Sequence, residues 1–233
     1  LRWGLEHSPM AQATRQAPTA RTTVQPRVLD NPTLDSRIYF VPGVAATLLL
    51  VVTLVVTAMG LAREKESGTL EQVLVTPMSS WAVVIGKVLP YAAIGLLDLA
   101  LAVALGSAIF SVPIRGSLPL LMFGGALYLL NTLGLGLFVA STARTQQQAF
   151  MGAFFLILPM VLRSGFMSPI SNMPAWLQPL TLLDPVRHMV EILRGVLLKA
   201  ATVTDLAQQL GILAAMGAAL FTGSALALKR RLS

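Results

Sequence analysis

Positions 44–62 of the chain read VAATLLLVVTLVVTAMGLA, and positions 63–71 read REKESGTLE. The first stretch carries no charge, whereas the second begins with alternating basic and acidic residues. A further apolar stretch, residues 81–110, is interrupted only by Lys87 and Asp98. An α-helix needs roughly 20 apolar residues to cross the hydrocarbon core of a bilayer. The pattern therefore predicts two membrane-spanning helices joined by a charged hairpin that lies at one face of the membrane.

The composition of the whole chain indicates an integral membrane protein. Of its 233 residues, 55% are hydrophobic and 12% are charged, whereas about a quarter of the residues in a soluble domain are charged. The chain has no cysteine, which excludes disulfides, thiolate metal sites and cysteine nucleophiles. Its two histidines, His7 and His188, are far apart in the sequence, so we expect no metal site.

The formal net charge of +7 does not indicate a nucleic-acid-binding protein. The arginines are scattered, and no basic cluster is interleaved with aromatic residues. A basic balance is ordinary in a membrane protein, because its loops favour lysine and arginine. We therefore expect no nucleic-acid partner.

Five apolar segments predict an all-α membrane domain over residues 39–233, preceded at residues 1–38 by a polar external tail or the remnant of an external domain. The predicted spans cover residues 39–62, 81–110, 118–140, 149–162 and 206–228. An odd number of spans puts the two ends of the chain on opposite sides of the membrane. The compact basic cluster Lys229-Arg230-Arg231 favours a cytoplasmic C-terminus under the positive-inside rule.

The segment between the last two predicted spans contains helix breaks and one strong helix start. Residues 164–169 read SGFMSP and end the fourth span. In Asp184-Pro185, aspartate is a favoured N-cap and proline a favoured first helical residue. Apolar residues then recur at helical spacing, and the opposite face carries Arg187, His188, Glu191 and Arg194. We expect this helix to lie in the membrane interface or to dip back into the membrane, with His188 in contact with solvent.

Three stretches of the chain resemble the ABC-2 class of ATP-binding-cassette transporter permeases. They are NPTLDSR at 31–37 leading into YFVPG at 39–43, REKESGTLE at 63–71 with Thr76-Pro77 after it, and SGFMSPISNMP at 164–174 continuing through Asp184-Pro185 to Glu191 and Arg194-Gly195. The resemblance extends from about residue 31 to the C-terminus. Members of this family typically have six spans, with a large external domain between the first two. The chain therefore looks like such a permease without its first span and most of that domain.

The charged hairpin is expected to carry a short helix. Thr69 and Gln72 form a capping-box pattern, so this helix should start at about Leu70. In the resembled family, this region is the coupling helix that docks on the nucleotide-binding domain. The resemblance gives as candidate ATPase contacts Glu64, Glu66, Gly68, Thr69, Leu70, Glu71 and Pro77. The alternative is an ordinary polar loop between two spans.

No ATPase is expected within this chain. Its single Gly-Lys pair, Gly86-Lys87, has no upstream glycine at P-loop spacing. We therefore expect a transport subunit that is not an enzyme and binds no cofactor itself, with ATP and Mg on separate ATPase subunits. Because family permeases work in pairs, the resemblance also implies a second permease copy or a paralogue, in a bacterial inner membrane.

Several residues are candidates for a transport pathway or gate. Asp98 lies deep in the second predicted span, where a carboxylate is costly and often functional. It could handle protons or cations, or it could be neutral or hydrogen-bonded to a residue such as Asn131 on a neighbouring helix. Arg163, Glu191 and Arg194 could form an external gate or meet an anionic substrate group. The favoured alternative is that Glu191 and Arg194 simply pair on the helix surface.

The last predicted span has a stripe of small residues that permits close helix contact. Its members are spaced four residues apart and are Gly211, Ala215, Ala219 and Gly223. The stripe could pack within one subunit, which we favour, or across a dimer. Gly134 and Gly136 in the third predicted span present the same two alternatives.

Three functions are compatible with these features. The leading hypothesis is the permease subunit of an ATP-driven exporter, which moves a drug-like, lipid or other hydrophobic solute by alternating access. The second is a nonfunctional or assembly-only membrane fragment, favoured by the missing first span. The third is an intramembrane enzyme, which needs paired catalytic groups at matched depth, whereas only Asp98 lies deep in a predicted span.

Overall fold

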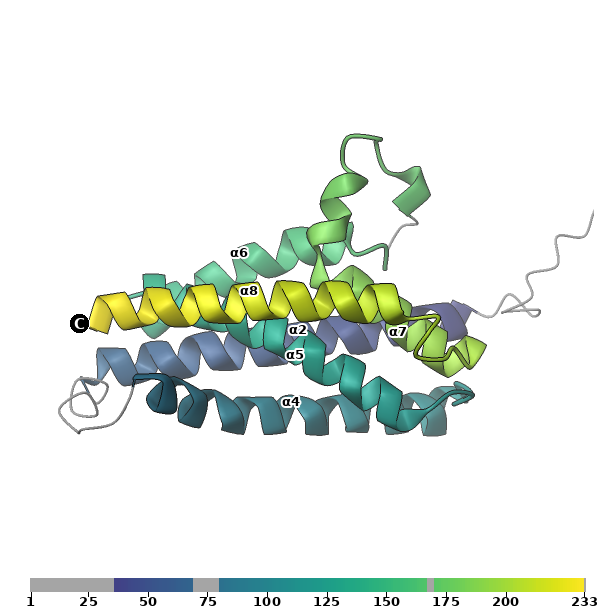
Figure 1. Ribbon diagram of the computed structural model, residues 1–233, viewed down its shortest axis with the longest axis horizontal. Coiled ribbons are helices and arrows are strands. Elements are labelled where there is room, and N and C mark those ends of the chain that lie inside the picture. The colour runs from purple at the N-terminus through teal and green to yellow at the C-terminus, as the bar shows by residue number, and fades with distance from the viewer. Residues whose placement is uncertain (1–35, 69–79, 167–169, 233) are drawn as a thin grey trace, which may run out of the picture. The chain divides into compact units, whose positions relative to one another are not determined.

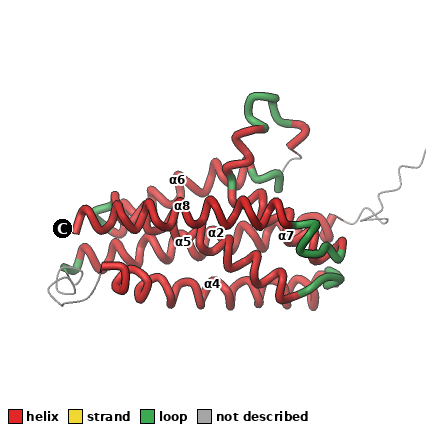
Figure 2. The backbone as a smooth tube through the Cα atoms, in the orientation of Figure 1, coloured by secondary structure: helices red, strands yellow, loops and turns green. Residues whose placement is uncertain are grey.

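The computed structural model describes residues 36–68, 80–166 and 170–232, which are mostly helical (Figure 1, Figure 2). The long helices are α2 (Ser36–Glu66), α4 (Ser80–Phe110), α5 (Leu118–Thr142), α6 (Gln146–Arg163), α7 (Pro185–Lys199) and α8 (Ala207–Leu232). Two short 3-10 helices, η1 (Ile170–Asn172) and η2 (Pro179–Leu183), lie between α6 and α7. The described residues contain no strand, so the predicted all-α class is confirmed. The predicted polar tail lies almost entirely outside the described residues.

Four of the described helices are long and apolar enough to cross a membrane. They cover residues 40–66, 85–110, 118–142 and 207–227, which agree with four of the predicted spans. The remaining predicted span, 149–162, coincides with α6, an 18-residue helix that begins with three glutamines. Because α6 does not reach the same combination of length and hydropathy, its crossing of the membrane stays a prediction.

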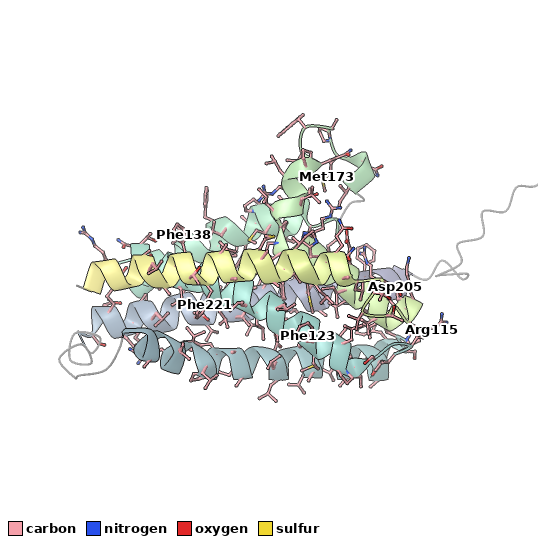
Figure 3. All side chains as sticks on the ribbon, in the orientation of Figure 1. Arg115, Phe123, Phe138, Met173, Asp205 and Phe221 are labelled. Atoms are coloured by element: carbon pink, nitrogen blue, oxygen red, sulfur yellow. The ribbon has the colours of Figure 1, made fainter. Side chains whose placement is uncertain are left out.

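The helices α2, α4, α5, α6 and α8 alternate in direction along the bundle (Figure 1). At one end, α2 and α5 terminate, α4 and α6 begin, and the chain finishes with α8; we call this the hairpin end (Figure 1). The opposite end holds α7, the start of α8 and the loop between α4 and α5; we call it the α7 end (Figure 1). Arg115 and Asp205 both lie at the α7 end, whereas Met173 lies on a segment that projects from the bundle (Figure 3).

The helix α5 lies at the centre of the bundle and packs against α2, α4, α6, α7 and α8. Its glycines allow this crowding. A Cβ atom at Gly134 would come within 2.9 Å of the backbone nitrogen of Phe221 in α8, and one at Gly136 would lie 2.8 Å from Cβ of Thr57 in α2. Both glycines therefore serve packing within the chain. Hydrogen bonds add to these contacts, since the Tyr128 hydroxyl donates to the Ala46 carbonyl at 3.1 Å.

The small-residue stripe of α8 faces away from this packing. Ala215 and Ala219 are exposed, and a Cβ atom at Gly211 or Gly223 would have no neighbour within 4 Å among the described residues. The face that contacts α5 instead includes Gly217, where a Cβ would lie 2.9 Å from Nδ2 of Asn131. Packing of the stripe within the subunit, the favoured alternative, is not found in the described residues. Its use across a dimer stays a prediction.

Candidate coupling junction and the α7 end

Arg63, which is exposed, and three further charged residues, Glu64, Lys65 and Glu66, form the last turn of α2. Consecutive side chains on an α-helix point about 100° apart, so these three can reach different neighbouring helices. Glu64 forms an ion pair with Lys87 in the early turns of α4. Lys65 and Glu66 instead reach the corner between α5 and α6.

This corner, residues 143–145, is held from both sides by α2. The Lys65 ammonium donates to the Ala143 carbonyl at 2.9 Å and to the Ser141 carbonyl at 3.5 Å, both at the C-terminal end of α5. The Glu66 carboxylate accepts the backbone N–H of Gln146, the first residue of α6, at 3.1 Å. A cation at a helix C-terminus and an anion at a helix N-terminus are both favourable for the helix dipole. Two adjacent residues of α2 therefore stabilise two helix ends of opposite polarity.

Only some of the predicted coupling residues belong to the part of the chain that the structure describes. Glu64, Glu66 and Gly68 lie in described parts of the chain, and Gly68 adopts a left-handed φ of 72° that glycine tolerates best. The remaining candidates, Thr69, Leu70, Glu71 and Pro77, lie outside the described residues, as does the predicted short helix. Docking on an ATPase therefore stays a prediction for all seven.

Sequence reasoning missed Lys65, Lys87 and Gln146 at this junction. The pairing of Glu64 with Lys87 could have been predicted from the sequence, because an antiparallel hairpin brings the last turn of one span beside the first turns of the next. No sequence pattern predicted the contact of α2 with the α5–α6 corner, since this contact depends on tertiary packing between segments 80 residues apart.

At the other end of the bundle, α7 begins as the sequence predicts. The Asp184 carboxylate accepts the Val186 N–H at 3.0 Å and so caps the helix. The interfacial or re-entrant position predicted for this helix stays a prediction, and α7 packs against α2, α5 and α8. His188 is consequently only 2% exposed, and its Nε2 lies 2.9 Å from the Leu182 carbonyl oxygen. The expectation of a solvated His188 is therefore wrong.

Arg163 and Glu191, two of the three candidate gate residues, bind different partners. The Arg163 Nε donates within its own helix to the Pro159 carbonyl at 3.0 Å. Glu191 pairs with Arg187, one turn back, at 3.2 Å, and not with Arg194 as expected. Glu191 also accepts a hydrogen bond from Gln209 of α8 at 3.1 Å. The pair with Arg187 lies at the partly exposed edge of α7, and Arg194 is half-buried on the same helix.

Asp184 has an electrostatic property that sequence reasoning missed. It is 1% exposed, and its Oδ2 has no hydrogen-bond partner among the described residues. Burial raises the pKa of the Asp184 carboxyl from an ordinary 3.8 to about 7, although the Val186 N–H and the positive charges of Arg163 and Arg187 act in the opposite direction. The carboxyl can therefore exchange a proton near neutral pH. The sequence signals only its capping role.

The alternative that pairs Asp98 with Asn131 is also not found. Asn131 Nδ2 donates to the Leu127 carbonyl at 2.8 Å and to the Leu213 carbonyl of α8 at 2.9 Å. Its amide faces α8, whereas Asp98 belongs to α4 on another side of α5. The Asp98 Oδ2 has no hydrogen-bond partner in the described part of the chain. The described residues also contain no group of acidic and histidine side chains that could hold a metal ion.

Residues 12–198 of the chain match the ABC-2 type transporter family. The chain is 40% identical over 172 residues to the probable multidrug ABC transporter permease YbhR of Escherichia coli (strain K12), covering 74% of this chain and 47% of that protein. It is 31% identical over 203 residues to the inner membrane transport permease YhhJ of the same strain, with 86% and 54% covered. It is 27% identical over 184 residues to the linearmycin resistance permease protein LnrN of Bacillus subtilis (strain 168), with 78% and 47% covered. The chain spans about half the length of the curated relatives it matches.

Proposed function

Because the chain belongs to the ABC-2 type transporter family, as a multi-pass membrane permease, we propose that it is the permease subunit of an ATP-driven exporter. The observation that carries this proposal is the hairpin end of the bundle. There the last turn of α2, which lies within the charged segment 63–71, binds α4, α5 and α6. A junction of this kind suits a subunit that receives a push from a soluble ATPase and alternates access across the membrane.

The energy source and the assembly follow from the family. ATP and Mg belong on separate ATPase subunits that dock on the hairpin, and two permease chains, identical or paralogous, form the membrane part. The exposed small-residue stripe of α8 supports contact with a second permease, since small residues let helices approach closely. The end of α2, the start of α4 and the end of α8 lie at the same end of the bundle (Figure 1). This supports a cytoplasmic C-terminus in a bacterial inner membrane.

The proposed substrate is a hydrophobic solute, such as a drug-like molecule or a lipid. The names of two relatives, a probable multidrug permease and a linearmycin resistance permease, support this class. A groove of about 400 Å³ between α2 and α4 also supports it, because every residue that lines it is apolar: Phe40, Val41, Val44, Ala45, Leu48, Ala102, Leu105, Gly106, Ile109 and Phe110.

Purification of the tagged chain from its native membrane in mild detergent tests the proposal. Mass spectrometry should identify a stoichiometric P-loop ATPase, and the substitutions Gly68→Val and Glu71→Arg should release it. Gly68→Val acts through the left-handed turn at that residue, and Glu71→Arg reverses a charge in the hairpin. Arg63→Gln, a change at an exposed residue just before this segment, is the control and should retain the ATPase. A wild-type chain that arrives alone would contradict the exporter and favour an assembly-only fragment.

A further inference from the structure

The corner between α5 and α6 satisfies its own helix ends only in part. The first four N–H groups and the last four carbonyls of a helix lack partners within that helix. Thr145 caps α6 through the N–H of Gln148 at 3.3 Å. The N–H of Gln146 is instead taken by Glu66, from another helix. The carbonyls of Ser141 and Ala143 at the end of α5 are likewise met by Lys65.

The order of charges along α2 is complementary to the end of α5 and the start of α6. An acidic residue at position 65 would face the negative end of α5, and a basic residue at position 66 would face the positive end of α6. The observed order, Lys65 then Glu66, gives attraction at both ends. Because the corner consists of residues 143–145 alone, the two contacts hold α5 and α6 together as one unit against the last turn of α2. That turn ends at Glu66, within the charged segment 63–71.

We propose that Lys65 and Glu66 are positioning residues that transmit movement of the last turn of α2, caused by an ATPase, to the α5–α6 corner. On this proposal, Glu66 acts inside the permease and is not a contact of the ATPase. Glu64 holds α4 through Lys87, so the same turn of α2 moves three other helices. The inference rests on the proposed function, because it requires an ATPase that acts on the hairpin.

The first test separates binding of the ATPase from coupling to it. Glu66→Ala removes both acceptor and charge, Lys65→Met removes the charge at similar length, and Arg63→Gln changes an exposed residue of the same turn. We expect Glu66→Ala and Lys65→Met to copurify with unchanged amounts of ATPase, while substrate moved per ATP hydrolysed in proteoliposomes falls about fivefold. Glu66→Gln, which keeps an acceptor for the Gln146 N–H, should give an intermediate value. Arg63→Gln should match the wild-type chain.

A second test uses the absence of cysteine from the chain. The double variant Glu66→Cys/Gln146→Cys removes the contact and offers a site for a short bismaleimide linker. The reduced variant should be as weakly coupled as Glu66→Ala, and cross-linking should restore most of the coupling. A purely structural role predicts no such recovery, because the folded state would be altered before the linker is added. A cross-linked chain that stays uncoupled overturns the inference.

The remaining outcomes distinguish the two proposals. If the wild-type chain copurifies with no ATPase, the proposed function fails and the inference fails with it. If only Glu66→Ala loses the ATPase, Glu66 is a docking contact, so the inference is wrong while the exporter stands. If all single variants transport as well per ATP as the wild-type chain, the contacts do not transmit movement. Size-exclusion profiles of each variant identify any that fails to fold, and Glu66→Gln then provides the comparison.

Discussion

The hairpin end of this bundle and the buried start of α7 hold their titratable residues in different ways. At the hairpin end, the charges of α2 remain partly exposed and reach across to other helices, as in the pair of Glu64 with Lys87, whose side chains are 35% and 20% exposed. At the α7 end, Asp184 and His188 are almost fully buried, and their hydrogen bonds stay within a few residues of their own positions.

The difference shows what each end can contribute. Contacts between partly exposed charges are individually weak and sensitive to salt, so the hairpin end can rearrange at low cost while linking several helices. Buried polar groups are costly unless they are satisfied, so the stability of the start of α7 depends on whether Asp184 is protonated. Substitutions at the two ends should therefore respond to different variables, salt at one and pH at the other.

The largest effect is expected from Asp184→Asn. The folded chain holds the Asp184 proton up to a pKa of about 7, whereas the unfolded chain releases it near 3.8, so stability falls as pH rises between these values. Asparagine keeps the acceptor for the Val186 N–H but never ionises. The variant should lose this pH dependence and gain at most about 4 kcal/mol relative to wild type above pH 7. Thermal unfolding in detergent from pH 4 to 8 measures the difference.

Asp205→Asn is the matched control for that experiment. Asp205 is solvent-exposed, and hydrogen bonds from Thr202 hold the pKa of its carboxyl below the ordinary value. Its stabilising effect is present above the ordinary pKa and is lost as pH falls below it. From pH 4 to 8 this effect is nearly constant, so the Asp205→Asn chain should keep the pH dependence of the wild-type chain, whereas the Asp184→Asn chain should lose it. Parallel profiles of the two variants would contradict a buried, protonated Asp184.

A smaller effect is expected from His188→Phe. This change removes the group at 2.9 Å from the Leu182 carbonyl and leaves that oxygen without its partner, at a cost of about 1 to 2 kcal/mol. His188→Gln keeps a donor and should lose less. Chemical denaturation of both variants in the same detergent makes the comparison, and equal losses would assign the effect to side-chain volume.

At the hairpin end, Lys87→Met should destabilise the chain by about 0.5 kcal/mol, because the pair with Glu64 is partly exposed. The loss should shrink as salt is raised from 50 mM to 500 mM, values chosen to shorten the Debye length severalfold. The charge-swapped double variant Glu64→Lys/Lys87→Glu should recover part of it. A loss that does not depend on salt would remove the contrast between the two ends.

The smallest effect is expected from Glu191→Gln at the edge of α7. The pair of Glu191 with Arg187 has i,i+4 spacing, which stabilises a helix by about 0.3 kcal/mol. Glutamine can still accept the hydrogen bond from Gln209. Thermal unfolding should therefore find this variant close to wild type, and a loss as large as that of His188→Phe would indicate that Glu191 takes part in a larger network.

Much of the fold could be predicted from the sequence. Long apolar segments fix α2, α4, α5 and α8, and Asp184-Pro185 fixes the start of α7, because these signals are local. The burial of His188 could not be predicted, since it depends on which helices cover α7. The partners of Asn131 and Glu66 depend in the same way on the side of α5 that each neighbour occupies. The contacting residues Glu64, Lys65 and Glu66 lie within the predicted segment 63–71, but the contacts with α5 and α6 could not be predicted.

The close contact of α5 with α8 strongly restricts which residue can stand at position 134. Any residue larger than glycine there would place an atom against the backbone of α8 itself, and a backbone cannot rotate aside as a side chain can. A lineage could replace Gly134 only together with a shift of the whole of α8. Among related sequences, glycine should therefore be retained at this position even where most of the surrounding apolar side chains differ.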